Sequence, residues 1–191
     1  MACRFYLVTG NMHKLEEASQ IVSRYGIELL IANVEKLEIQ SESLTNIALT
    51  AARHAYNRLR KPVIVDDSGL FVDALNGFPG PYSSYVYKKL GVHGILKLLE
   101  EVENRHACFQ TALAMIYPPI EKVFTGAVCG AIAYSPRGER GFGFDPIFIP
   151  EGYTSTFAEM TLEEKNRVSH RARAFKRFAE YASNWLRCTK R

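Results

Sequence analysis

Two adjacent carboxylates follow a short apolar run in the first half of the chain. Residues 63–65 are valine, isoleucine and valine, and Asp66, Asp67 and Ser68 come next. The β-branched run predicts a buried strand that ends where the acids begin, because a core does not tolerate unpaired carboxylates. Ligands in open α/β sheets bind outside the carboxyl ends of strands. The stretch therefore predicts an active site, and for Asp67 a functional role is favoured over a structural one.

Glu38 is a third candidate acid, in a short extended segment at residues 36–40. Carboxylates that converge without basic partners suit Mg²⁺, which prefers oxygen ligands and keeps water and substrate phosphates in its other positions. The five histidines are dispersed along the chain, which disfavours zinc. A solvated surface position is the alternative for Glu38.

Residues 9–14, TGNMHK, have the composition of a strand-to-helix turn that binds phosphate. Gly10 lets the backbone approach a ligand, Asn11 can cap the following helix, and Lys14 adds positive charge near the first helical N–H groups. The Walker pattern is absent. A purely structural junction between a strand and a helix is the alternative.

Two later segments could contact a planar ring or a polyanion. In residues 141–146, phenylalanines alternate with glycines and Asp145 supplies an acceptor, which suits a stacked purine. Residues 165–171 bring Lys165, Arg167 and Arg171 close together before the last predicted helix. Core packing of the aromatic rings and solvation of the basic side chains are the structural alternatives.

The elements that must position these residues follow an α/β order. Gly26 should end the first helix, and the two longest strands are apolar on both faces, as expected for interior strands. Phe175, Phe178 and Trp185 belong to an apolar stripe of the last helix that we interpret as core packing. The expected strands span residues 5–8, 28–32, 63–65, 107–117, 122–134 and 146–149, and the expected helices include residues 15–25, 44–60, 83–90 and 93–102.

Length and composition fit one soluble domain. The chain has 191 residues, of which 47% are hydrophobic and 23% charged. We find no signal-peptide pattern, and no apolar run approaches the roughly 20 residues of a membrane span. A cytosolic location is the default expectation. The four cysteines lack metal-ligand spacing, so reduced thiols are expected, although Cys108 and Cys129 lie on neighbouring predicted strands and could form a bridge.

The net charge of +4 is unevenly distributed. Basic residues concentrate between Lys165 and Arg191, where Glu180 is the single acid. Such a stretch could bind nucleic acid or a polyanionic small molecule. Beyond Arg173, a solvated basic helix face is the simpler interpretation.

Together these motifs resemble the inosine/xanthosine triphosphate pyrophosphatases, which hydrolyse non-standard purine nucleoside triphosphates to the monophosphate and pyrophosphate. The matching stretches occur in the family's order and span nearly the whole chain. They are VTGNMHK (8–14), LEIQSE (37–42), DDSGLFVDALNGFPGPYSSY (66–85), GFGFDPIFIPEG (141–152), TFAEMTLEEKN (156–166) and SHRARA (169–174).

The resemblance implies an α/β fold with an elongated, mixed central sheet flanked by helices. Residues 1–191 would form a single pyrophosphatase domain of two lobes, with the nucleotide in a cleft between them. It also implies Mg²⁺ as cofactor, with Mn²⁺ as a possible substitute, and a cytoplasmic homodimer. The expected partner is a small-molecule nucleotide, and neither nucleic acid nor a membrane is expected to bind.

The resemblance further implies roles for individual residues. Asp67 would be the general base and, with Glu38, a metal ligand, while Asp66 would either bind the metal as well or support the residues that do. The implied substrate contacts are Thr9, Gly10, Asn11, Met12, His13 and Lys14 for phosphate, Ser68, then Phe142, Gly143, Phe144 and Asp145 for the base, and Lys165, His170 and Arg171. The family commonly has tyrosine in place of Phe144, so any role of that hydroxyl is lost here.

The hydrogen-bonding edge of the purine base also suggests how substrates would be distinguished. Hypoxanthine and xanthine present a carbonyl and a protonated ring nitrogen where adenine presents an amino group and an unprotonated nitrogen. A pocket of fixed N–H donors with one acceptor would leave buried polar groups unpaired with ATP. Guanine adds an amino group that the pocket must exclude. We therefore expect ITP, dITP and XTP to be better substrates than ATP or GTP.

Two other classes of function remain open. A phosphatase with an aspartate nucleophile would explain Asp66 and Asp67, but those enzymes need the pattern D-x-D, which is absent. A nucleic-acid-binding module would explain the basic C-terminal stretch, but the chain contains no recognisable nucleic-acid-binding motif.

Overall fold

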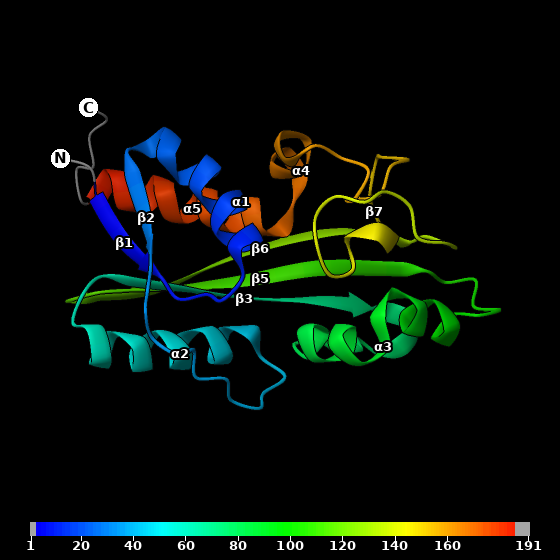
Figure 1. Ribbon diagram of the computed structural model, residues 1–191, viewed down its shortest axis with the longest axis horizontal. Coiled ribbons are helices and arrows are strands. Elements are labelled where there is room, and N and C mark those ends of the chain that lie inside the picture. Colours follow the sequence, from blue (N-terminus) through cyan, green and yellow to red (C-terminus); the bar gives the residue numbers. More distant parts are fainter. Residues whose placement is uncertain (1–2, 186–191) are drawn as a thin grey trace. The chain divides into compact units, whose positions relative to one another are not determined.

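The computed structural model describes residues 3–185 and contains one mixed sheet of seven strands with helices on its faces (Figure 1). The strands are β1 (Cys3–Leu7), β2 (Ile27–Ile31), β3 (Val63–Val72), β4 (Pro79–Gly80), β5 (His106–Tyr117), β6 (Ile120–Ile132) and β7 (Phe148–Pro150). The helices are α1 (Met12–Val22), α2 (Leu44–Leu59), α3 (Ser83–Leu98), α4 (Leu162–Val168) and α5 (His170–Trp185). The α/β class is confirmed.

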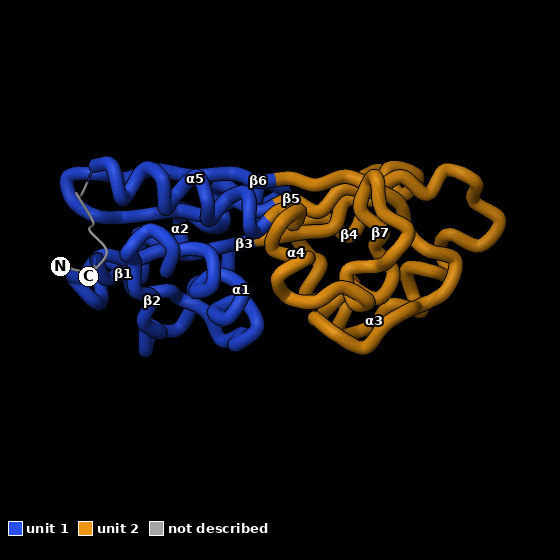
Figure 2. The backbone as a smooth tube through the Cα atoms, turned by 90° about the horizontal axis from the view of Figure 1, so that it is seen from above, with its two compact units in different colours: residues 1–67, 111–126, 171–191 blue, residues 68–110, 127–170 orange. Residues whose placement is uncertain are grey.

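The sheet has the strand order β2-β1-β3-β5-β6-β7, and β4 pairs with β3. Strand β1 is parallel to both β2 and β3, whereas the β3–β4 and β6–β7 pairs are antiparallel. The chain divides into two compact units (Figure 2). Unit 1 comprises residues 1–67, 111–126 and 171–191, and unit 2 comprises residues 68–110 and 127–170. Strands β3, β5 and β6 therefore contribute residues to both units.

The core of unit 1 lies between the sheet and helices α1 and α5, while α2 covers the opposite face (Figure 1). Phe5 of β1 meets Phe178 of α5 edge to face, with ring centroids 5.0 Å apart. The predicted apolar stripe of α5 is confirmed for Phe175 and Phe178, which are fully buried. Trp185 departs from the prediction because it is 44% exposed and stacks on Tyr181.

Helix α2 confirms the prediction of a helix over residues 44–60 to within one residue. Ser43 caps it by accepting a hydrogen bond from the N–H of Asn46. Its buried face includes Ala48, Ala51 and Ala55, whose small side chains let the helix lie close to the sheet.

The prediction that the central strand ends before Asp66 is wrong, because β3 continues to Val72. Its first part pairs with β1, where Leu7 lies opposite Ile64, and its last part pairs with β4, where Leu70 lies opposite Gly80. Strand β1 ends at Leu7. The two acids are therefore inside a strand, just past the carboxyl end of its parallel neighbour, and beyond them the strand also pairs with β4.

Unit 2 has its own apolar core, which includes Phe109, Phe148 and Phe157. The two helical segments predicted at residues 83–90 and 93–102 are confirmed up to Leu98, because the backbone of α3 is non-helical at Gly91, where φ is 62°, and this break separates two helical stretches. The expectation of reduced thiols is wrong for Cys3, which is disulfide-bonded. It is also wrong for Cys108 and Cys129. These residues form a disulfide because β5 and β6 are neighbours and bring their Cα atoms to within 4.0 Å. Cys188 lies outside the described residues.

Within residues 3–185, no helix is both long and apolar enough to cross a membrane.

Gly69 should be sensitive to any added side chain. A Cβ atom at this position would collide with the carbonyl group of Gly80 on the paired strand β4. We expect Gly69→Ala to lower the free energy of unfolding by about 1–3 kcal/mol, the usual cost of overpacking. Gly10→Ala is the control, since no heavy atom lies within 4 Å of the Cβ it would add. Equal urea midpoints for the two variants would contradict the prediction.

Candidate active site

Asp66 lies at the centre of a buried group of charges in unit 1. Its side chain is 1% exposed, and its Oδ2 lies 3.1 Å from Nζ of Lys14 on α1 and 3.1 Å from Nε of Arg171 on α5. Arg171 also donates a hydrogen bond of 2.5 Å to Oε2 of Glu17. We call these four residues, Lys14, Glu17, Asp66 and Arg171, the buried charge cluster. It links α1, β3 and α5 through ion pairs that little water can reach.

The cluster keeps Asp66 ionised. Burial alone would raise the pKa of its carboxyl group, but Lys14, Arg171 and Lys36 outweigh burial and hold that pKa well below its ordinary value. Burial likewise opposes the charge of Arg171, but Glu17 and Asp66 raise its pKa further above the usual range. Burial lowers the pKa of Lys14 despite the nearby Asp66. A carboxylate held this tightly by cations is a poor proton acceptor, so Asp66 is suited to positioning Lys14 and Arg171.

Asp67 has different surroundings from its neighbour. Its side chain is 13% exposed and accepts a hydrogen bond of 2.7 Å from Nζ of Lys36, which lies 3.4 Å from Oε1 of Glu38. Burial raises the pKa of Asp67, and Lys36 and Lys14 only partly offset this effect. Asp67 is therefore the more basic of the two adjacent carboxylates, which is the property required of a general base.

The carboxylates of Asp67 and Glu38 fit a magnesium ion. They come from separate segments and both contact the ammonium group of Lys36, so the expectation that these acids lack a basic partner is wrong, but the two carboxylates do lie around one cation. Mg²⁺ in nucleotide enzymes is often held by one or two carboxylates together with water and substrate phosphates. Glu38 is 72% exposed and is thus accessible to solvent ions. Asp66 fits less well, because its Oδ2 already contacts Lys14 and Arg171.

Residues 9–14 form the predicted strand-to-helix turn. Asn11 is the N-cap of α1 and accepts a hydrogen bond of 3.0 Å from the N–H of His13. The N–H of Asn11 in turn donates to Oγ1 of Thr9, at 3.1 Å. Gly10, Met12 and His13 are exposed. The N-terminal end of α1 therefore faces solvent one turn before Lys14, as a phosphate site requires.

The phenylalanines of residues 141–146 differ in their surroundings. Phe144 is buried in the core of unit 2, and its ring meets Tyr87 edge to face at a centroid distance of 5.5 Å. Phe142 is only half-buried, and Nζ of Lys165 lies 4.9 Å from its ring centroid. Next to it, the space beside Gly143 is open, with no heavy atom within 4 Å of an ideal Cβ. Phe142 is therefore the better placed of the two rings to meet a ligand, and Phe144 is a core residue.

Asp145 and Lys165 stabilise this segment from inside. Oδ2 of Asp145 accepts hydrogen bonds from Nζ of Lys165, at 2.6 Å, and from the N–H of Phe142, at 2.8 Å. Both charged side chains are buried. In the structure Oδ2 of Asp145 fixes the backbone of the loop, and its role as an acceptor for the base stays a prediction.

His170 and Ser68 complete the predicted set. The imidazole of His170 is buried and stacks on Phe109, with ring centroids 4.7 Å apart and an interplanar angle of 10°. Ser68 is half-buried and is the first residue of unit 2. Thus Lys14, Asp66, Asp67, Glu38 and Arg171 come together in unit 1, while Phe142, Phe144, Asp145, Lys165 and His170 belong to unit 2.

Glu17 and Lys36 were missed by the sequence analysis. Glu17 lies among the apolar positions of α1, and an acid on a buried helix face is a signal of a buried cationic partner. Lys36 precedes Glu38 by two residues, which in an extended segment places both side chains on one side. Lys165 and Arg171, which suggested a basic surface, are buried in ion pairs instead.

Known proteins resemble this chain over almost its whole length. A sequence model of the Ham1 family matches residues 5–181. A dITP/XTP pyrophosphatase of Hyperthermus butylicus is 52% identical over 188 residues, which cover 98% of this chain and 97% of the relative. A dITP/XTP pyrophosphatase of Methanopyrus kandleri is 55% identical over 177 residues, covering 92% and 94% of the two chains. The structure of a HAM1 protein from Coxiella burnetii superposes with a TM-score of 0.85 at 30% identity, covering 95% of this chain and 99% of that one.

Removing Arg171 should destabilise the fold. Arg171→Met would leave Glu17 and Asp66 buried without their shared cation, and we expect a loss of about 3–5 kcal/mol in the free energy of unfolding. Arg167→Met is the matched control, because Arg167 pairs with Glu163 on the surface, where an ion pair contributes little. Urea denaturation measures both effects. Similar midpoints for the two variants would show that the buried charge cluster is not a stabilising network.

Proposed function

Because this chain belongs to the Ham1 family, we propose that it is a nucleoside triphosphate pyrophosphatase that hydrolyses the non-standard purine nucleotides ITP, dITP and XTP. The names of its relatives, dITP/XTP pyrophosphatases about half identical over nearly the full chain, support this activity. The observation that carries the proposal is the pair of adjacent carboxylates in β3, of which one is neutralised by buried cations and the other has a raised pKa. The products are the nucleoside monophosphate and pyrophosphate.

In the proposed reaction, Asp67 accepts a proton from a water molecule that attacks the α-phosphorus. A bond forms between the water oxygen and the α-phosphorus, and the bond from that phosphorus to the bridging oxygen of the β-phosphate breaks. Lys14 and the N–H groups at the start of α1 offset the charge of the triphosphate. We assign Arg171 a positioning role, since it is buried and reaches the site through Asp66. Catalysis of this kind depends mainly on positioning and electrostatic stabilisation.

Asp67 and Glu38 would hold Mg²⁺, for which Mn²⁺ could substitute. The ion supplies a Lewis acid that neutralises phosphate charge. Lys36, which contacts both carboxylates, would keep them close together before the ion arrives.

The segment of residues 141–145 is the proposed base site. Phe142 would stack on the purine in the open space beside Gly143. Asp145, Lys165 and Phe144 would fix the loop from inside, so that its remaining polar groups meet the base in one geometry. Such a rigid site discriminates well, because the wrong base leaves buried donors or acceptors unpaired.

We further propose that the protein is a cytoplasmic homodimer that binds neither nucleic acid nor a membrane. Several large apolar side chains at the start of α3 and just before it are exposed, and a second copy of the chain would cover such a surface. They are Phe78, Tyr82, Tyr85, Tyr87 and Leu90. In the cytoplasm, the enzyme would encounter non-standard triphosphates in the nucleotide pool.

Substrate preference tests the activity directly. With Mg²⁺ present, we expect kcat/KM for ITP, dITP and XTP to exceed that for ATP and GTP by about 100-fold or more, because a polar site rejects mismatched hydrogen-bonding edges strongly. Release of pyrophosphate measures the rates. Equal rates on ATP and ITP would exclude the proposed specificity, and release of inorganic phosphate alone would exclude the proposed reaction.

The two adjacent acids should respond differently to amidation. We expect Asp67→Asn to lower kcat by about 10²–10⁴-fold through loss of the general base, with little loss of stability. Glu38→Gln should mainly raise the Mg²⁺ concentration needed for half-maximal activity. Glu163→Gln, at an exposed ion pair on α4, is the control for both. Near-native turnover by Asp67→Asn in saturating Mg²⁺ would show that another group is the base.

A further inference from the structure

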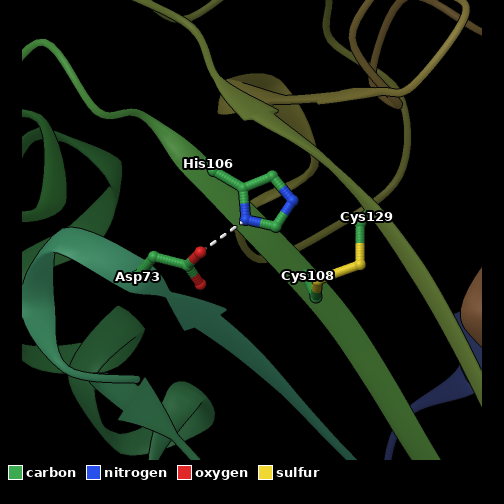
Figure 3. The surroundings of a disulfide bond; sticks show 4 residues. All are labelled: Asp73, His106, Cys108 and Cys129. Carbon is green, nitrogen blue, oxygen red and sulfur yellow. Dashed lines mark hydrogen bonds and ion pairs between the residues drawn. A yellow bond between two sulfur atoms is a disulfide. The ribbon is translucent and has the colours of Figure 1, made fainter.

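A second group of potential metal ligands lies in unit 2, apart from the residues discussed above. His106 and Cys108 come from β5, and Cys129 comes from β6 (Figure 3). One ligand atom from each of the three lies within 4.8 Å of the others, and no other group of three His, Cys, Asp or Glu residues between residues 3 and 185 meets this criterion. We call these three residues the Cys–His cluster.

The strand geometry explains why the three side chains meet. His106 and Cys108 are two residues apart in a strand and so point to the same face of the sheet. Cys129 lies opposite Cys108 on the neighbouring strand, and the two form the disulfide described above. The side chain of His106 is 49% exposed, and both cysteines are half-buried. The cluster is therefore accessible to ions and to small reductants.

Asp73 orients the ring of the histidine. Its Oδ2 lies 2.6 Å from Nδ1 of His106, so the tautomer that carries its proton on Nδ1 can donate to this carboxylate and leave the lone pair of Nε2 for a metal ion. Figure 3 shows Asp73 on one side of the imidazole ring and the two cysteines on the other. A carboxylate bonded to the second nitrogen is the usual support of a metal-binding histidine, since it orients the ring and increases its basicity.

We propose that the Cys–His cluster is a redox-controlled binding site for a thiophilic divalent metal such as Zn²⁺. In the oxidised protein, the two sulfur atoms are bonded to each other and cannot act as thiolates. An external dithiol can donate two electrons and two protons, which converts the disulfide into two thiols while the dithiol becomes a disulfide. The metal then displaces both thiol protons into solvent and binds Sγ of Cys108, Sγ of Cys129 and Nε2 of His106.

Three protein ligands of this kind match known zinc chemistry. Zinc sites with two cysteines, one histidine and a water molecule have this donor set, and thiolates select zinc over magnesium. The site is also separate from the proposed base site, because Phe109, which follows Cys108, points to the opposite face of β5 and stacks on His170. The proposal therefore does not depend on the function proposed for the chain.

Cobalt provides a spectroscopic test with the full-length protein. The disulfide is reduced with a water-soluble phosphine, which takes an oxygen atom from water as two thiols form, and the phosphine is removed without air. Co²⁺ is then added as a probe for Zn²⁺. We expect the reduced protein to bind one Co²⁺ with a sulfur-to-cobalt charge-transfer band, which Zn²⁺ abolishes, and the oxidised protein to show no band. Carboxylates alone, as at Asp67 and Glu38, cannot produce this band.

Matched variants assign the band to its ligands. Cys108→Ser/Cys129→Ser should abolish it, His106→Gln should weaken binding, and Asp73→Asn should lower the affinity by about 10–100-fold, the usual effect of losing such a support. The controls are Cys3→Ser/Cys188→Ser, which removes the other two cysteines, and His93→Gln, at an exposed histidine of α3. Both controls should keep the band.

A measurement on the reduced wild-type protein does not depend on whether the variants fold. Bound Zn²⁺ should slow alkylation of Cys108 and Cys129 at least about 10-fold, as counted by mass spectrometry of the corresponding peptides, since thiolates held by zinc are protected. The proposal is overturned if the reduced protein gives no charge-transfer band, if the band survives in Cys108→Ser/Cys129→Ser, or if Zn²⁺ gives no protection.

Discussion

The burial of Asp66 is the constraint on which unit 1 depends. Removing a carboxylate from water costs several kcal/mol, and only well-placed cations can offset that cost. Here the cations come from two different helices, Lys14 from α1 and Arg171 from α5, so both helices must lie in one register against β3. The apolar core between the sheet and these helices supplies most of the stability, and the ion pairs determine how the helices are positioned on the sheet.

The same principle operates in both units. A buried acid is neutralised by a buried cation, and the pair holds in place a neighbouring group that is less buried. In unit 1 the ion pairs of Asp66 accompany the more basic Asp67. In unit 2 the Asp145–Lys165 pair holds the backbone next to the half-buried Phe142. The residues that make the site rigid are thus different from those best placed to meet a ligand.

Local patterns in the sequence predicted those features of the fold that local interactions determine. The periodicity of α2, its end near residue 60 and the break at Gly91 all follow from spacing and from glycine conformations. The length of β3 could not be predicted this way, since two acids normally end a buried strand, and its partners β4 and β5 come from later parts of the chain.

The members of the site were predictable to the extent that they occur in motifs. Motif residues such as Lys14, Asp67 and Phe142 were identified by their type and context. Glu17 and Lys36 were not, because their roles arise from partners brought near by the fold. Sequence spacing likewise gave no sign that His106, Cys108 and Cys129 lie close together, since their proximity depends on the pairing of two strands.

The continuous course of β3 through its two aspartates makes residue spacing as important as residue identity. Successive side chains of a strand point to opposite faces, so Asp66 meets the cations of α1 and α5 while Asp67 meets Lys36. The pKa is thereby lowered for one residue and raised for the adjacent one, although no loop separates them. A one-residue insertion or deletion between Val63 and Asp66 would turn both acids to the opposite faces of the sheet, and only one of them would take the other's place, although every candidate site residue would still be in the sequence. Insertions and deletions in this strand should therefore be tolerated less often than many substitutions.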